Sequence, residues 1–290
     1  MKTPDLLSRL HEALRSLKLP GMRSHLEEVA GHARQEGLSY EAFLLELVER
    51  ECDGRRQSRI VRALQASRLP PEKTLETFDR QRLPRSVDAQ LSALLEGPFL
   101  GRQENVLAFG PPGTGKSHLL CALGHELVHA GYQVLFRPCD LLVQDLLLAK
   151  RELTLAKLLK AWSRFDALII DDIGYVQRSR EEMEVLFNLL AHRYERGSVL
   201  LTANLPFSRW EEIFRDPMTT AAAIDRLVHH SVVLELNIPS YRLEQAMHRS
   251  PATPTAALSD NYPATAGDNY PATAGDNYSA ATDDSAAAPT

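Results

Sequence analysis

The chain has 290 residues, of which 44% are hydrophobic and 24% are charged, a composition typical of a globular protein with one or two domains. Its formal net charge of -5 arises in the segment 251–290, which holds five acidic residues and neither Lys nor Arg. The rest of the chain carries 33 basic and 33 acidic residues and is therefore neutral, although its basic residues are unevenly placed.

The sequence disfavours a membrane-spanning protein and a secreted, disulfide-rich one. No apolar run reaches the length of about 18 residues that a membrane span needs, and the N-terminus alternates Leu with charges, unlike a secretory signal. The three cysteines, Cys52, Cys121 and Cys139, are far apart and form neither a zinc pair nor a disulfide framework. We therefore expect a cytoplasmic protein without a membrane partner.

Residues 1–85 are predicted to form a helical domain. Leucines recur at helical spacing in LLSRLHEALRSLKL, and LPGM at 19–22 interrupts the pattern. A second helical pattern starts with SYEAFLLEL, where Ser39 is the expected N-cap; the capping box is incomplete because Ala42 replaces Glu. The paired prolines of LPPEKTLETFD at 69–79 cannot continue a helix and end the region.

Six arginines but only two acidic residues lie between positions 50 and 68. The candidate DNA-binding residues are Arg55, Arg56, Arg59 and Arg62. Arg55, Arg59 and Arg62 recur at i, i+4 and i+7 and therefore share a helix face. Their planar guanidinium groups suit contacts with phosphates. Because no aromatic residues interleave for base stacking, sequence-independent binding to double-stranded DNA is expected. A solvated basic face, or a docking face for an acidic partner, is equally open.

Residues 86–250 show a different pattern, in which short apolar runs alternate with helical stretches. The runs are NVLAF at 105–109, QVLF at 133–136, ALIID at 167–171, SVLLT at 198–202 and VVLEL at 232–236. Strands separated by amphipathic helices are typical of βαβ units. The pattern predicts a three-layer α/β fold with a parallel five-stranded sheet.

The segment GPPGTGKS satisfies the phosphate-loop motif G-x-x-x-x-G-K-[ST], with a predicted strand before it and a helix after it. The candidate nucleotide-binding residues are Gly110, Pro111, Pro112, Gly113, Thr114, Gly115, Lys116, Ser117 and His118. The glycines let backbone N–H groups surround phosphates, and the helix adds its positive end. Lys116 is expected to reach the β- and γ-phosphates, and the Ser117 hydroxyl to bind Mg²⁺.

Polar side chains follow two of the other predicted strands. Asp171 ends a buried run and is the expected Mg²⁺-side carboxylate, since ligands of parallel α/β sheets bind at the carboxyl edge. Asp172 could orient or deprotonate the attacking water, or could merely cap the next element. Asn204 follows SVLLT and could hold the same water, although Asn is also common in turns.

The helix after the phosphate loop also contains H-E-x-x-H at His125–His129, a zinc signature of metalloproteases. Its extended form fails, because Gly131 follows His129 by two residues and no third His stands in place. We expect both histidines on the solvent face of a helix that ends at Gly131, and no zinc.

The segment 251–290 is predicted to be disordered. DNYPATAG recurs at 260–267 and 268–275, and DNYSAATD follows, so large aliphatic side chains are almost absent. Its spaced tyrosines could instead serve as short binding motifs.

Together these motifs resemble the AAA+ ATPases, and in particular the IstB-type helper ATPases of bacterial insertion sequences, relatives of the DnaC helicase loaders. The resemblance covers about residues 5–248 and includes LKLPGM, LIIDDIGY, LLTANLPF, AIDRLVHHS and SYR. It implies that 110–117 is Walker A, that Asp171 and Asp172 form Walker B, and that Asn204 is sensor 1. Arg226 would act as a finger on the ATP of a neighbouring subunit, although an ion pair with Asp225 or Glu235 is the alternative. Asp172 departs from the usual Glu of AAA+ proteins.

The resemblance also implies an ATPase domain at 86–250 without the usual C-terminal helical lid. The implied activity is Mg²⁺-dependent ATP hydrolysis by a homo-oligomer, a ring or a filament, with active sites between subunits. Such a protein would assemble on DNA in the bacterial cytoplasm and recruit or activate a cognate transposase. A replicative helicase loader, a small-molecule kinase and a degenerate ATP-binding adaptor are the alternatives.

Overall fold

A computed structural model describes residues 3–173, 179–210 and 217–249. The predicted disordered tail at 251–290 lies outside these residues. The described helices and strands belong to one unit, Met1–Arg249. The proposed boundary near residue 85 stays a prediction.

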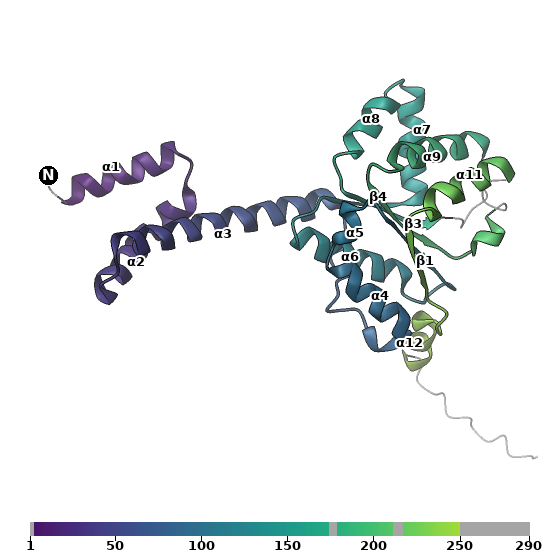
Figure 1. Ribbon diagram of the computed structural model, residues 1–290, viewed down its shortest axis with the longest axis horizontal. Helices are drawn as coiled ribbons and strands as arrows, with labels where there is room; N and C mark the ends of the chain where they lie inside the picture. Colours follow the sequence, from purple (N-terminus) through teal and green to yellow (C-terminus); the bar gives the residue numbers. More distant parts are fainter. Residues whose placement is uncertain (1–2, 174–178, 211–216, 250–290) are drawn as a thin grey trace, which may run out of the picture. The chain divides into compact units, whose positions relative to one another are not determined.

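Three helices make up the N-terminal part: α1 (Thr3–Ser16), α2 (Pro20–Glu36) and α3 (Tyr40–Ser67) (Figure 1). The predicted interruption at 19–22 is placed too late, since α1 ends at Ser16 and α2 already begins at Pro20. Pro20 is accepted in the first helical turn because its missing N–H would have no partner there. Ser39 caps α3 by accepting a hydrogen bond from the Ala42 N–H, as expected. Leucines and a valine from the three helices form a small apolar core.

A buried carboxylate joins α2 to α3. Glu51 of α3 is 5% exposed and accepts hydrogen bonds from the Gly21 N–H (2.7 Å) and the Met22 N–H (3.1 Å) at the start of α2. Its other oxygen accepts from Arg55 Nε at 2.7 Å. The negative charge therefore satisfies free N–H groups at the positive end of a helix.

The segment after α3 is irregular, as the paired prolines predict. It leads through a short helical turn, η1 (Arg80–Arg82), to α4 (Arg85–Leu95) and α5 (Pro98–Gly101). Residues 70–78 pass over the helix that follows the phosphate loop, where Pro70, Thr74 and Thr77 contact its histidines. This segment therefore connects the N-terminal helices to the nucleotide site.

The sheet has five parallel strands in the order β2-β3-β4-β1-β5. They are β1 (Asn105–Phe109), β2 (Val134–Pro138), β3 (Ala167–Ile173), β4 (Ser198–Ala203) and β5 (Ser231–Glu235). The predicted fold class is thus confirmed, and each predicted strand overlaps the observed one.

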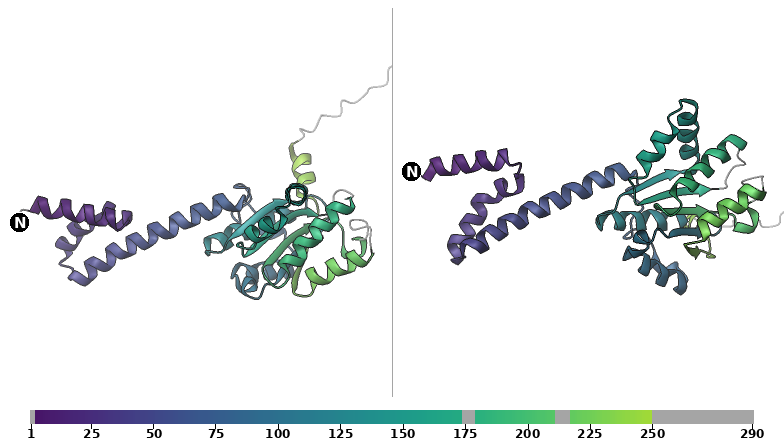
Figure 2. Two further views of the ribbon diagram at one scale, coloured as in Figure 1. Left: turned by 90° about the horizontal axis from the view of Figure 1, so that it is seen from above. Right: turned by 45° about the horizontal axis from the view of Figure 1, so that its top comes forward.

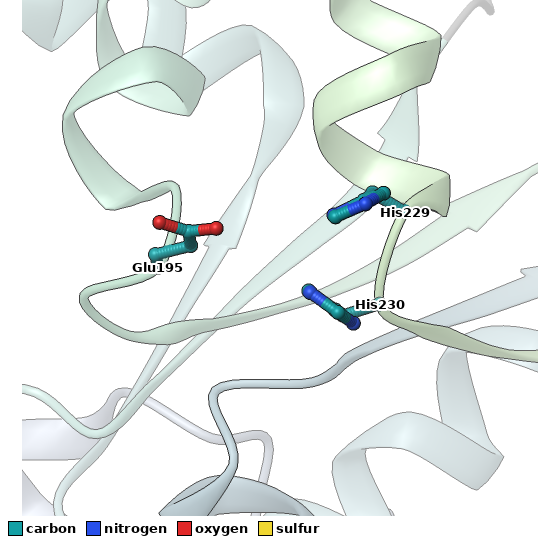
Figure 3. Close-up of side chains that lie close together, drawn as sticks. All are labelled: Glu195, His229 and His230. Carbon is teal, nitrogen blue, oxygen red and sulfur yellow. The ribbon is translucent and has the colours of Figure 1, made fainter.

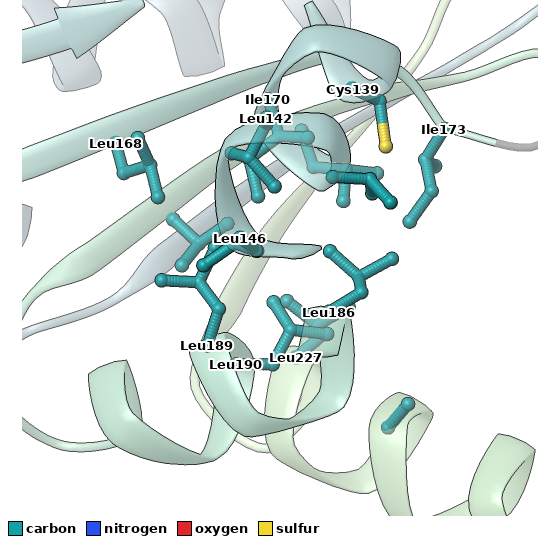
Figure 4. Close-up of a cluster of buried hydrophobic side chains, with 14 of the residues drawn as sticks. Cys139, Leu142, Leu146, Leu168, Ile170, Ile173, Leu186, Leu189, Leu190 and Leu227 are labelled. Carbon is teal, nitrogen blue, oxygen red and sulfur yellow. The ribbon is translucent and has the colours of Figure 1, made fainter. Parts of the chain in front are cut away.

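Helices cover both faces of the sheet (Figures 1 and 2). The helices on one side are α4, α5 and α6 (Lys116–His129), and those on the other are α7 (Cys139–Arg151), α8 (Leu155–Trp162), α9 (Arg180–Arg193) and α11 (Pro217–Val228). Successive strand residues face opposite sides: Leu168 and Ile170 belong to one apolar cluster, and Ile169 to the other. Figure 4 shows the first cluster, in which leucines of α7, α9 and α11 meet β3.

After β5 the chain forms α12 (Tyr241–Arg249), the last described helix. The absence of a further helical lid stays a prediction, because it concerns the chain beyond this helix. None of the helices in the described ranges is both long and apolar enough to cross a bilayer.

Candidate nucleotide-binding site

The phosphate loop joins β1 to α6 and depends on its glycines. Gly110, Gly113 and Gly115 have φ angles of 152°, 81° and 93°, which L side chains rarely adopt. A side chain at Gly110 would collide with the Leu236 carbonyl, and one at Gly113 with Ser240. The loop therefore approaches the start of the C-terminal segment closely, and its backbone leads into the first turn of α6.

Lys116 is 4% exposed and lies folded into this loop. Its Nζ donates hydrogen bonds to the carbonyl oxygens of Gly110 and Pro111, each at 2.9 Å. Burial lowers the pKa of the ammonium group, against the opposing charges of Asp172 and Asp171. A phosphate entering the loop would compete with two neutral carbonyls for a charged donor, which favours the phosphate.

A cavity of about 450 Å³ lies in front of the loop, a size suited to a nucleotide. Its lining comes from residues 72–82, from the loop and α6, from Asp172 and Asn204, and from the segment 238–242. Five stretches that are distant in sequence thus converge at the carboxyl edge of the parallel strands.

The two aspartates at the end of β3 face different surroundings. Asp171 is 9% exposed and its Oδ1 accepts a hydrogen bond of 2.6 Å from the Thr202 hydroxyl. Asp172 has a φ of 60°, lines the cavity, and donates its backbone N–H to the same hydroxyl at 2.8 Å. Partial desolvation in the cavity, and then the Asp171 charge, raise the pKa of Asp172. The Thr202 hydroxyl is therefore hydrogen-bonded to both aspartates.

Asn204 completes the polar side of the cavity. Its Nδ2 lies 3.5 Å from Asp172 Oδ1 and donates to it weakly. Its Oδ1 is buried and has no hydrogen-bond partner within the part of the chain that the structure describes. Buried polar atoms are rarely left unsatisfied, so this amide is suited to a water or a ligand group in the cavity.

Arg226 lies elsewhere, at the end of α11, and does not line this cavity. Its guanidinium stacks over the Phe187 ring at 4.7 Å and donates to the Ala222 carbonyl at 2.9 Å. Its backbone carbonyl accepts from Asn105 at the opposite, amino end of β1. No ion pair with Asp225 or Glu235 is found among the described residues.

Three residues next to the cavity are absent from the predicted site: Arg242, Thr74 and Phe78. Arg242, in the SYR motif, lines the cavity, and its charge acts on both Lys116 and Asp172. His118 Nε2 lies 3.0 Å from the Thr74 carbonyl, and Phe78 packs edge-on against the His118 ring. The SYR motif could have indicated the arginine, but the other contacts join segments more than 30 residues apart.

The four candidate DNA-binding arginines are all exposed on α3. Arg55 pairs with Glu51 and also donates to the Lys18 carbonyl at 2.8 Å, while Arg62 donates its Nε to the Ser58 carbonyl. Arg56 and Arg59 make no ion pair or hydrogen bond within the described ranges. Their guanidinium groups are therefore the ones left for a ligand.

The expected placement of the H-E-x-x-H histidines is wrong for one of them. His129 is exposed, but His125 is 9% exposed and its Nε2 lies 3.0 Å from the Pro70 carbonyl. The cause is the 70–78 segment, which covers this side of α6. The helix ends before Gly131, which has a φ of 100°, as predicted.

The fold and the loop define a P-loop protein with a nucleotide-sized cavity. The chain aligns with the structure of AMPPCP-bound DnaA from Aquifex aeolicus with a TM-score of 0.50 and 21% sequence identity. The alignment covers 62% of this chain and 56% of that one. At this identity the likeness concerns the fold alone.

Residues 12–249 match the family model of the IstB-like ATP-binding proteins, and the chain belongs to this family. It is 43% identical over 241 residues to an insertion sequence ATP-binding protein of Sinorhizobium fredii, covering 83% of this chain and 81% of that protein. It is 39% identical over 263 residues to the insertion sequence IS21 ATP-binding protein of Pseudomonas aeruginosa, covering 90% and 99%.

Proposed function

We propose that this protein is a Mg²⁺-dependent ATPase that assembles on DNA and thereby assists a transposase. The observation that carries the proposal is the cavity in which Lys116, Asp172 and Asn204 converge beside a glycine loop. The buried, unsatisfied oxygen of Asn204 and the positive φ angles of the loop suit a nucleotide with an ordered water.

In this proposal Asp172, Asn204 and Lys116 have different roles in ATP hydrolysis. The oxygen of a water forms a bond to the γ-phosphorus while the bond to the β–γ bridging oxygen breaks, and ADP and phosphate leave. Asp172 accepts the proton of the water, and the Asn204 amide orients it. Lys116 exchanges its loop carbonyls for phosphate oxygens and stabilises the negative charge.

The magnesium ion would be held by the Ser117 hydroxyl and by Asp171. Ser117 lies in the first turn of α6 and lines the cavity, and Thr202 donates a hydrogen bond to Oδ1 of Asp171. Magnesium neutralises charge on the β- and γ-phosphates when bound. The oxygen donors present suit a hard cation.

Arg226 would complete the site of a neighbouring copy. The loop follows the carboxyl end of β1, whereas the Arg226 backbone lies at its amino end, about 16 Å away for a five-residue strand. The guanidinium therefore cannot serve the ATP of its own chain. A finger supplied by the neighbour makes hydrolysis depend on assembly.

For DNA, we propose that α3 contacts phosphates without reading sequence. Arg56 and Arg59 are exposed and unpaired within the described part, so they are the first candidates, with Arg62 beside them and Arg55 partly committed to Glu51. Neutralising phosphates releases counterions, so affinity should fall with salt.

For a partner, we propose the cognate transposase, because the relatives described above are insertion sequence proteins. A pull-down of the tagged chain with ATP, offering the transposase and the replicative helicase of the same host, separates the two candidates. Retention of the transposase is expected. Retention of the helicase alone would make the protein a helicase loader.

The test of the activity is phosphate release with and without DNA, for the wild type and Lys116→Ala. The wild type should hydrolyse ATP, faster with DNA, and Lys116→Ala should lose at least 100-fold. Lys157→Ala, an exposed lysine on α8, is the control and should keep the wild-type rate. No phosphate release by the wild type in either condition would end the proposal, and so would transfer of phosphate to a small molecule without release.

A further inference from the structure

Two histidines and a glutamate come together at the amino edge of the sheet. His229 and His230 connect α11 to β5, and Glu195 lies in the turn between α9 and β4. One ligand atom of each side chain lies within 4.8 Å of the other two. Figure 3 shows both imidazole rings extending toward the Glu195 carboxylate. All three side chains are exposed and thus accessible to an ion from solution.

We propose that Glu195, His229 and His230 bind a transition-metal ion, with Zn²⁺ as the preferred ion. Two imidazole nitrogens and one carboxylate oxygen are a donor set that suits zinc and disfavours magnesium, which prefers oxygen ligands. Three protein ligands leave one tetrahedral position for water or for a group of another molecule. The site is separate from the nucleotide cavity and does not depend on the proposed ATPase activity.

The turn that carries Glu195 is held in place before any ion binds. Glu195 has a φ of 54°, an unfavourable backbone conformation for this residue. The N–H groups of Arg196 and Gly197 donate to the Arg193 carbonyl at 2.9 and 3.1 Å. The buried Arg193 guanidinium in turn donates to the backbone carbonyls of Phe165 and Asp166, before β3, and of Ser198, directly after the turn, the last at 3.0 Å. The carboxylate is therefore presented from a fixed backbone.

The two histidines are also oriented by neighbours. The Tyr194 hydroxyl lies 3.3 Å from Nδ1 of His229, the kind of outer contact that fixes the ring of a metal ligand. The His230 carbonyl accepts from the Asn105 N–H at 2.7 Å, which anchors that residue at the start of β5. The two rings pack edge to face with centroids 4.2 Å apart.

A small cavity adjoins the cluster. Glu195 and His230 line this cavity, whose volume of about 20 Å³ is enough for one water-sized group. Arg226 lines the same cavity, so a bound ion would lie beside the candidate finger.

The test is Zn²⁺ binding by calorimetry to the tag-free full-length chain after removal of metals with a chelator. The wild type should bind one zinc per chain, and His230→Ala, His229→Ala and Glu195→Gln should each weaken binding at least tenfold. Excess Mg²⁺ should not displace the zinc. His129→Ala, which removes an exposed histidine of the H-E-x-x-H motif, should bind as the wild type does.

Thermal unfolding gives a second readout, because an ion that binds only the folded chain raises the unfolding temperature. Zinc should raise it for the wild type and His129→Ala and not for His230→Ala, whose unfolding temperature without zinc should match the wild type. The proposal is overturned if the wild type binds zinc no more tightly than His230→Ala. It is equally overturned if His129→Ala loses as much affinity as the site variants.

Discussion

The nucleotide cavity and the arginine surface of α3 are both sites for phosphates, but their residues are constrained to different degrees. In the cavity, three loop glycines have positive φ angles, and two aspartates share one threonine hydroxyl. On α3, exposed arginines stand on a regular helix, and one of them is tied to Glu51. Backbone geometry thus restricts what the cavity can bind, whereas only charge restricts what the α3 surface can bind.

The largest expected effect tests the backbone requirement of the cavity. Gly113→Ala would place a methyl group against Ser240 at a φ of 81° and should weaken ATP binding at least 100-fold. Gly131→Ala is the matched control, because Gly131 has a φ of 100° but open space around it. Fluorescent nucleotide titration measures both variants. Equal losses in the two variants would mean that strain, and not the cavity, is responsible.

A smaller effect separates binding from catalysis. Asn204→Ala should lower kcat by about 100-fold and leave ATP affinity within about threefold, because the amide is needed for the water and not for the phosphates. Ser208→Ala, at an exposed position nearby, should behave as the wild type. Steady-state phosphate release measures kcat, and nucleotide titration measures affinity. An unchanged kcat would remove Asn204 from the mechanism.

The salt dependence of DNA affinity tests which arginines of α3 contact phosphates. Arg56→Ala and Arg59→Ala should each reduce the slope of log K for DNA against log salt by about one, as expected for a lost phosphate contact. Arg55→Ala should change the slope less, because its guanidinium already serves Glu51 and Lys18. Fluorescence anisotropy at several salt concentrations gives these slopes. Unchanged slopes for Arg56→Ala and Arg59→Ala would favour a docking face for an acidic protein.

The smallest effect concerns stability. Burial alone would raise the pKa of Glu51, but hydrogen bonds from Arg55, Met22 and Gly21 outweigh it and hold the pKa below its usual value. Because its pKa is lower in the folded state, the charged Glu51 carboxylate stabilises the fold at pH values above its unfolded-state pKa of about 4.3. This contribution is lost as the pH falls through the folded-state pKa. Glu51→Gln should cost about 1–3 kcal/mol at pH 7 and less at pH 3, measured by urea unfolding. Equal costs at both pH values would contradict the assignment.

The strands and the phosphate loop could be predicted because their signals are local. Each strand is an apolar run between turn residues, and the loop needs its glycines at fixed spacings within one short segment. Helix α2 lacks such a local signal, because only Leu26 and Val29 of its residues are buried and its apolar pattern is weak.

The parts that sequence could not predict depend on contacts between distant segments. The burial of His125 requires Pro70, and the cavity wall requires Phe78 beside His118. Glu195 and His230 meet only because β4 and β5 both flank β1. No sequence motif indicates that these residues lie close together. The H-E-x-x-H motif at 125–129 is therefore not the cluster of metal-ligand side chains that the fold brings together.

The central claim is that each ATP is hydrolysed with an arginine from a neighbouring copy, and subunit mixing tests it most directly. Arg226→Ala retains its own cavity, and Asp172→Asn retains its own arginine, so each alone should hydrolyse ATP at less than about one hundredth of the wild-type rate on DNA. Mixing the two variants should restore a substantial fraction of the activity, because the Asp172→Asn subunit supplies Arg226 to an intact site. If the mixture shows no more activity than the variants alone, or if Arg226→Ala alone is as fast as the wild type, the account is contradicted.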